Sequence, residues 1–247
     1  MSPSTRLMIL AAGLLVSCGG SSKDAKLKDQ ELDALFVAPL VPAQTAITAM
    51  FLLPFVGSFG IECPAVTELE SGGFKVEGDC TTEGGETWSG SMLWEGADIT
   101  WDAFEMPGMS IDGSQSVFGN GLTSNLSVTM SDGDVAHAMT YTDYKVPNFM
   151  EFYTATLSEA PYSLDFSGKI SVDDLGEFDT TGSVQDDLTC ESEPTSGGFT
   201  MVGEFTFEVT FDGGTDCDGC IGWNTDDHSG SKCYEEGDTG GGDDTGL

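Results

Sequence analysis

Cysteine thiols are the groups in this chain whose chemistry follows most directly from their number and spacing. Six of the seven cysteines lie beyond residue 60, at Cys63, Cys80, Cys190, Cys217, Cys220 and Cys233. An even number of cysteines in an exported protein is typical of disulfide bonds. Cys63 and Cys80 are far in sequence from the others, so they are predicted to pair with each other. The pairing of the remaining four stays open.

Cys217 and Cys220 have a Cys-x2-Cys spacing that suits two other kinds of chemistry. Redox-active pairs of this spacing accompany alternating strands and helices, a pattern that this sequence lacks. A zinc site would need the C-terminal cysteines as thiolates, whereas an oxidising compartment favours disulfides. Disulfides are therefore the preferred interpretation, and neither a metal nor a cofactor is predicted.

Carboxylates dominate the charge of the chain. There are 42 acidic and 8 basic residues, which gives a formal charge of −34 at pH 7. Such a charge repels nucleic acids and anionic lipids, so the predicted electrostatic partners are cations or a basic protein surface. Closely spaced aspartates near the last cysteines could supply calcium ligands, at Asp212, Asp216, Asp218, Asp226 and Asp227. They match no twelve-residue calcium loop, so solvated loops are the preferred interpretation.

Few other residues have the types that catalysis needs. His137 lies in an alternating, strand-like segment and His228 in a polar loop, so a repeated histidine role is not expected. The run 229–232 matches the Ser-x-x-Lys pattern of penicillin-recognising enzymes, but their companion motifs are absent. Trp88 and Trp94 could stack on a sugar, although aromatic residues in strands usually belong to the core. The chain is therefore predicted not to be an enzyme.

The N-terminus has the pattern of an export signal. Arg6 precedes an apolar run from Leu7 to Val16, which is too short to span a bilayer as a helix. The run Leu15-Val16-Ser17-Cys18 resembles the lipobox of bacterial lipoproteins, in which the chain is cut before the cysteine and the cysteine is acylated. The alternatives are an ordinary secretory signal with a chance cysteine, or an uncleaved apolar start.

The resemblance covers residues 1–18 only, and it implies a location rather than an activity. The mature protein would be anchored through Cys18 by acyl chains, palmitate among them, to a membrane of the cell envelope. The expected place is the outer membrane, on its periplasmic or surface face. The oligomeric state stays open.

The remaining sequence divides into segments of different composition. The predicted organisation is a signal peptide at 1–17, a tether at 18–30, a helical segment at 31–59, one β domain at 60–234 and a disordered acidic tail at 235–247. A helix is predicted from Ala43 to Leu53, with Pro42 in its first turn and Pro54 ending it. We expect this helix to pack on a sheet, with a position at a membrane surface as the alternative.

Beyond Gly60 the apolar residues change from a helical period to a period of two. A strand is expected from Phe199 to Phe211, with Phe205 and Phe207 on a dry face and Thr206 on a wet one. Other strands are expected at 74–80, 86–94, 98–106, 122–131, 135–143, 149–157, 162–173 and 178–188. One apolar and one polar face indicate antiparallel pairing. The predicted fold class is mainly β, an antiparallel meander sheet that is open, curved, sandwich-like or barrel-like, with one or two short N-terminal helices.

These observations predict an exported, membrane-anchored lipoprotein with a non-enzymatic binding or envelope-structural task. The alternative is a carrier or chaperone for a lipid or another hydrophobic ligand, in which a curved sheet cups the ligand. An exported hydrolase has the weakest support. A large apolar cavity on the concave face of the sheet would favour the carrier, whereas a filled face would favour the first function.

Overall fold

The computed structural model describes residues 27–58, 62–132, 135–190, 193–215 and 217–233. The predicted signal peptide, Cys18 and the acidic tail lie outside these ranges. The helices are α2 (Asp29–Val37), α3 (Val41–Ile47), the π-helical turn η2 (Thr48–Leu52), α4 (Leu53–Ser58) and α5 (Phe149–Ser158). The strands are β1 (Ala65–Glu68), β2 (Gly73–Glu77), β3 (Cys80–Thr81), β4 (Thr87–Glu95), β5 (Asp98–Met106), β6 (Met109–Phe118), β7 (Gly121–Asp132), β8 (Val135–Val146), β9 (Tyr162–Val172), β10 (Gly176–Asp186), β11 (Ser196–Val202), β12 (Thr206–Phe211), β13 (Cys220–Thr225) and β14 (Ser229–Cys233).

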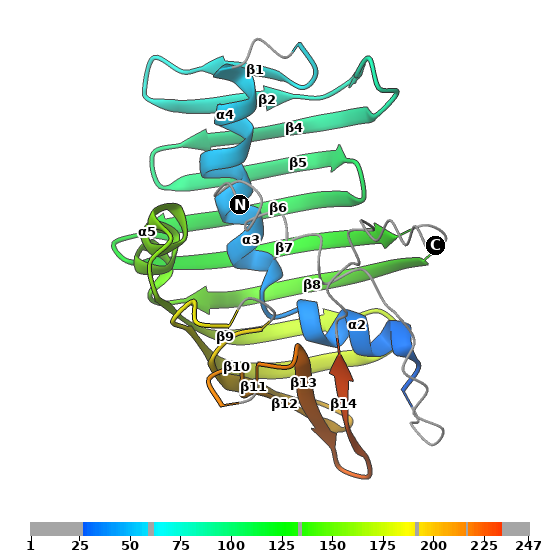
Figure 1. Cartoon of the computed structure of the whole chain (residues 1–247). Coiled ribbons are helices and arrows are strands. Elements are labelled where there is room, and N and C mark those ends of the chain that lie inside the picture. The colour runs from blue at the N-terminus through cyan, green and yellow to red at the C-terminus, as the bar shows by residue number, and fades with distance from the viewer. Residues whose placement is uncertain (1–26, 59–61, 133–134, 191–192, 216, 234–247) are drawn as a thin grey trace, which may run out of the picture.

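The strands form one fourteen-stranded antiparallel sheet with a simple meander order. Each strand pairs with the next along the chain, except that β2 pairs directly with β4 and the short β3 pairs only with β4. Figure 1 shows β1, β2 and β4 to β8 stacked as successive rungs, with β9 to β14 continuing the sheet at its other end. The predicted mainly-β, antiparallel meander fold is confirmed, and it takes the form of an open, curved sheet.

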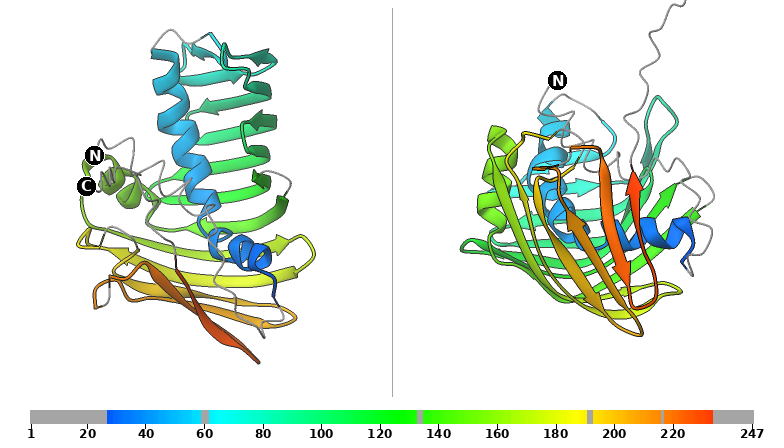
Figure 2. Two further views of the ribbon diagram at one scale, coloured as in Figure 1. Left: turned by 45° about the vertical axis from the view of Figure 1, so that its right-hand side comes forward. Right: turned by 60° about the horizontal axis from the view of Figure 1, so that its bottom comes forward.

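The N-terminal helical segment covers one face of this sheet. Two views show α3, η2 and α4 crossing the strands nearly at right angles, while α2 turns away beside the later strands (Figures 1 and 2). Along this path α4 packs at β1, η2 at β4, and α3 at β7 and β8. Apolar residues from helices and strands form a single buried cluster, in which Leu35 and Ala46 meet the side of the sheet that carries Phe104 and Tyr141. The predicted packing of a helix on the sheet is confirmed.

The helix predicted from Ala43 to Leu53 differs from the expected one at its end. Pro42 lies in the first turn of α3, as predicted. Pro54 does not end the helix, because the chain continues as α4 to Ser58. The preceding π-helical turn, Thr48–Leu52, shifts the hydrogen-bonding pattern, so the missing N–H of Pro54 falls at the junction between two helical forms.

Strand β7 shows how the two faces of the sheet differ. Leu122, Leu126 and Val128 are buried toward the helices, whereas Asn125 and Ser127 are exposed on the opposite side. Burying the apolar set on one face only is what the alternating pattern predicts for an antiparallel sheet. The wet face is therefore polar along this strand.

The segment predicted as one strand from Phe199 to Phe211 is two strands joined by a tight turn. The Gly203 N–H donates to the Phe205 carbonyl at 3.0 Å, and Met201 then pairs with Phe207. Paired residues of an antiparallel hairpin share a face, so the alternation continues unchanged through the turn and conceals it. Phe207 is buried as predicted, whereas Phe205, at the turn, is only half-buried.

The strand predicted at 149–157 is wrong, because this segment is the helix α5. Phe149 and Phe152, three residues apart, both turn into the core. The hydroxyls of Thr154 and Thr156 donate to the carbonyls of Met150 and Phe152, each at 2.8 Å and four residues back. Such bonds let threonine, a residue common in strands, satisfy its hydroxyl within a helix.

A buried polar cluster joins the helical segment to the sheet. Gln115 of β6 is 2% exposed, and its amide nitrogen donates to the Pro42 carbonyl at 2.7 Å and to Ser124 at 3.0 Å. Its amide oxygen accepts from the Trp101 indole at 3.2 Å and from Thr45 at 3.3 Å. One side chain thus ties α3 to three neighbouring strands.

Two tyrosines of β8 bind the short connection between α2 and α3. The hydroxyls of Tyr141 and Tyr144 donate to the carbonyls of Ala38 and Pro39, each at 2.8 Å. Burial raises the pKa of both phenols well above the usual range, so both stay neutral donors. The break between the helices is therefore held to β8 by side-chain bonds to free carbonyls.

Among the described residues, no single helix is long and apolar enough to cross a membrane, although the bent pair 29–37 and 41–55 meets the same criteria when the two helices are taken together.

Candidate functional site

All six cysteines beyond residue 60 form disulfides. Cys63 pairs with Cys80, which confirms the one pairing predicted. The four that were left open pair as Cys190–Cys217 and Cys220–Cys233. The two cysteines of the Cys-x2-Cys run therefore belong to different disulfides. Both bridges join segments of the C-terminal part of the sheet, after β10. Cys18, the predicted lipidation site, lies outside the described residues.

The described C-terminal aspartates lie in loops and turns, where two of them accept backbone hydrogen bonds. Asp218 accepts from the Cys220 N–H at 2.8 Å, and Asp226 accepts from the Thr206 N–H at 3.1 Å. Asp216 lies outside the described residues. Within the described ranges, no three His, Cys, Asp or Glu side chains are placed to hold a metal ion. The structure thus uses Asp218 and Asp226 to stabilise turns.

Glu193 is a carboxylate that the sequence analysis missed. It is 5% exposed, and within the described part of the chain neither of its carboxylate oxygens has a hydrogen-bond partner. Burial raises its pKa, and the negative charges of Asp212 and Asp218 raise it further. No feature of the sequence distinguishes it from the many other acidic residues, since its position depends on the disulfide Cys190–Cys217 and the loops around it.

A second charged cluster joins the two ends of the described chain. Asp33 of α2 forms an ion pair with Lys232 of β14, and both side chains are largely buried. Burial raises the pKa of the Asp33 carboxyl, while Lys232 and, less strongly, His137 of β8 oppose the rise. In the sequence, Lys232 stood out only through a chance Ser-x-x-Lys match. In the structure it links β14 to α2 through its ion pair with Asp33.

Each lysine among the described residues lies against a carboxylate. The pairs are Lys28–Glu31, Lys75–Glu77, Lys145–Asp143, Lys169 with Glu177 and Asp179, and Lys232–Asp33. Because carboxylates far outnumber these lysines, the surface keeps a strongly negative field.

Trp88 and Trp94, the two tryptophans considered for sugar stacking, pack against the core side of the sheet. A third, Trp101 of β5, is buried, and its indole donates to Gln115. Trp88 packs on Phe104 with ring centroids 5.9 Å apart, and the Trp94 indole donates to the Gly96 carbonyl at 3.2 Å. The structure thus gives these rings packing roles.

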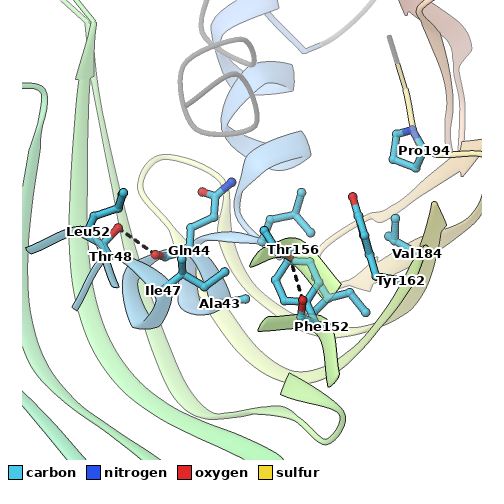
Figure 3. Close-up of a pocket in the computed structure, with 12 residues that line it drawn as sticks. Ala43, Gln44, Ile47, Thr48, Leu52, Phe152, Thr156, Tyr162, Val184 and Pro194 are labelled. Carbon is cyan, nitrogen blue, oxygen red and sulfur yellow. Dashed lines mark hydrogen bonds between the residues drawn. The ribbon is translucent and has the colours of Figure 1, made fainter. Parts of the chain in front are cut away.

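A small apolar groove lies between the helical segment, α5 and strands β9 and β10. Figure 3 shows Ala43, Ile47 and Leu52 on one wall and Tyr162 and Val184 on the other, with α5 between them. Its volume is about 60 Å³, and it is lined by Leu40, Ala43, Gln44, Ile47, Thr48, Leu52, Phe152, Thr156, Tyr162, Leu164, Val184 and Pro194. Drug-sized ligands usually occupy roughly 300–1,000 Å³. The groove has room for a slender aliphatic group and not for a folded lipid.

The polar groups beside this groove are mostly satisfied within the protein. Thr48 donates to the Gln44 carbonyl at 2.9 Å, and Thr156 donates to the Phe152 carbonyl at 2.8 Å (Figure 3). Burial, together with the neighbouring Asp186, raises the pKa of the Tyr162 phenol far above its usual range. Tyr162 is therefore neutral at physiological pH and unsuited to act as a base.

Comparison with protein families, with curated proteins and with solved structures found no match to this chain.

Proposed function

We propose that this protein is an exported lipoprotein, anchored through Cys18, whose β domain has a non-enzymatic binding or envelope-structural task. The anchor rests on the lipobox-like run Leu15-Val16-Ser17-Cys18. Three disulfides in the described residues support an oxidising compartment. Two independent features of the chain therefore agree with export.

The observation that carries the proposed task is that the N-terminal helical segment covers the apolar face of the sheet, apart from the small groove beside α5. The segment from Asp29 to Ser58 covers that face and is fixed there by Gln115, Tyr141 and Tyr144. A face that is packed and hydrogen-bonded in this way is a core rather than a ligand cup. The surfaces left for partners are the polar outer face and the negatively charged loops.

The anchor is tested by supplying cells with a labelled fatty acid and comparing the wild type with Cys18→Ser. We expect the wild type to carry label and to fractionate with membranes, and the variant to lose both properties. Ser21→Ala is a matched control in the predicted tether, and it should behave as the wild type. Label that persists on Cys18→Ser would refute acylation at Cys18.

A carrier for a slender hydrophobic chain is the second candidate, and the groove between α3 and α5 favours it. In Val184→Trp the larger ring should fill this groove, whereas Leu93→Trp places the same ring on the outer face and serves as the control. Purified protein would be extracted with organic solvent and the extract analysed by mass spectrometry. A stoichiometric lipid that is present in the wild type and in Leu93→Trp, and is lost in Val184→Trp, would favour the carrier over the first proposal.

A further inference from the structure

The side of the N-terminal helical segment that faces away from the sheet carries large apolar side chains. Phe51 of η2 and Phe55 of α4 stack with their ring centroids 5.7 Å apart and their planes at 15°. Phe55 is 45% exposed in spite of this contact, and Phe51 and Leu52 are half-buried. Ala49 and Leu53, by contrast, are buried in the core. Along this part the helix is therefore apolar on its inner side and on its outer side.

This outer side is uncharged in a chain that is otherwise dense in carboxylates. No Asp, Glu, Lys or Arg occurs from residue 34 to residue 61, although the whole chain has 42 acidic and 8 basic residues. A helix that is apolar all round is usually buried, in a protein core or in a membrane. The apolar stripe, which consists of Phe51, Leu52 and Phe55, therefore fits hydrocarbon better than it fits water.

The predicted lipid anchor would leave the domain on the side that carries this stripe. Helix α2, the first described helix, packs into the same core as α3 and lies with α3 and α4 on one side of the sheet (Figures 1 and 2). Ten residues, 19–28, separate Cys18 from Asp29, and a chain of this length spans at most about 35 Å. The helical run 41–58 is about 27 Å long at 1.5 Å per residue. Acyl chains on Cys18 can therefore enter the same bilayer surface that the stripe would touch.

Lipids without net charge are the partner that the chemistry of the stripe fits. Interfacial helices usually bind through apolar residues on one side and through Lys or Arg on the other, and these basic residues are attracted to anionic lipids. Here the other side of the helix is packed on the sheet, and the chain has a formal charge of −34, which anionic lipids repel. Contact with a membrane would therefore depend on the apolar side chains alone.

We propose that the apolar stripe docks on the hydrocarbon boundary of the anchoring membrane, so that the domain lies with its helical side on the bilayer. This inference rests on the proposed anchor at Cys18, which brings the domain to the membrane without fixing its orientation. Insertion of the Phe51 and Phe55 rings fixes that orientation. The polar outer face of the sheet is thereby turned toward the solvent, where binding partners can reach it.

Photocrosslinking of the protein purified from membranes tests this orientation. The photoreactive amino acid benzoylphenylalanine replaces either Phe55 or Leu93, and each variant is reconstituted into vesicles of phosphatidylcholine with radiolabelled acyl chains. Leu93 is the matched control, because it is 36% exposed on the outer face of β4, the strand on whose inner face η2 packs. Both side chains are partly exposed, so both variants should fold, and a thermal unfolding midpoint equal to that of the wild type is the criterion.

After illumination, the variant with the probe in place of Phe55 should carry roughly ten times as much labelled lipid as the variant with the probe in place of Leu93. Burying one aromatic side chain in hydrocarbon favours the docked orientation over the others by at least this factor. The yield should not rise when phosphatidylglycerol replaces part of the phosphatidylcholine, because the stripe contains no basic group.

The possible failures of the docking and of the anchor are distinguishable. Protein that floats with the vesicles but crosslinks equally from both positions would overturn the docking and leave the anchor intact. Protein that does not float with the vesicles would refute the anchor and the docking together. Crosslinks from the Phe55 position to a second copy of the protein in place of lipid would assign the stripe to self-association. A yield that rises with phosphatidylglycerol would assign the contact to basic groups, and either of these last two results overturns the proposal.

Discussion

Replacing Gln115 with leucine should detach the helical segment from the sheet while keeping an apolar side chain of similar size. The substitution removes four hydrogen bonds that span 2.7–3.3 Å and that connect Gln115 with Pro42, Thr45, Trp101 and Ser124. The Pro42 carbonyl keeps one partner, since it also accepts from the Thr45 hydroxyl at 3.0 Å. The Trp101 indole N–H keeps none and stays buried, and such an orphaned group costs about 1–3 kcal/mol.

The expected total loss of stability is larger than this single term. Thr45 and Ser124 also lose a partner, although their hydroxyls can rotate, and each lost bond contributes about 0.5–1.5 kcal/mol. The leucine recovers part of this by burying apolar surface. We therefore expect the free energy of unfolding to fall by about 2–4 kcal/mol.

Urea unfolding followed by tryptophan fluorescence measures this loss, because Trp101 lies in the affected cluster. The midpoint should fall while the denaturant slope stays unchanged, since the surface exposed on unfolding is nearly the same. Ser114→Ala, next to Gln115 but exposed on the outer face, is the control and should change stability by less than about 0.5 kcal/mol. A loss below about 1 kcal/mol for Gln115→Leu would refute the view that this cluster fastens the helices to the sheet.

Three further predictions concern stability. Replacing Cys63 and Cys80 with serine should cost about 3 kcal/mol on the loop-entropy view, measured as a lower midpoint of thermal unfolding; thiols that react in the unreduced wild type would show that the bridge is absent. Phe207→Asp should prevent stable folding, whereas Thr210→Asp, on the exposed side of the same strand, should cost less than about 1 kcal/mol; similar losses in urea would contradict a one-sided sheet. Lys232→Met should destabilise by about 3–5 kcal/mol because Asp33 is left buried without its partner, and adding Asp33→Asn should restore part of that loss; a double-mutant cycle without coupling would rule out the pair as a link between α2 and β14.

Local patterns in the sequence were enough to predict much of the sheet. The strand expected at 98–106 matches β5, and the one at 162–173 matches β9 within a residue. Both predictions succeeded because a strand that is buried on one side must alternate its side chains, whatever its neighbours are. The bridge between Cys63 and Cys80 was predictable for a related reason, since no other cysteine is near them in sequence.

The same reasoning failed where two structures share one pattern. Residues 149–157 offered apolar side chains that fit either period, and only the packing of Phe149 and Phe152 into the core decides for a helix. The alternation from Phe199 to Phe211 gave no sign of a turn, because hairpin pairing preserves the alternation. Pattern alone therefore identifies faces better than it identifies ends or connections.

The sequence by itself determined a one-sided antiparallel sheet, a strongly negative surface and six cysteines suited to disulfides. Only the tertiary structure decided that the chain covers its own concave face, how the last four cysteines pair, and that Glu193 is enclosed. These features depend on contacts between distant residues, such as Gln115 with Pro42, and Asp33 with Lys232. A buried amide or carboxylate is the same residue type as a solvated one, and its energy is set by partners that are not its neighbours along the chain.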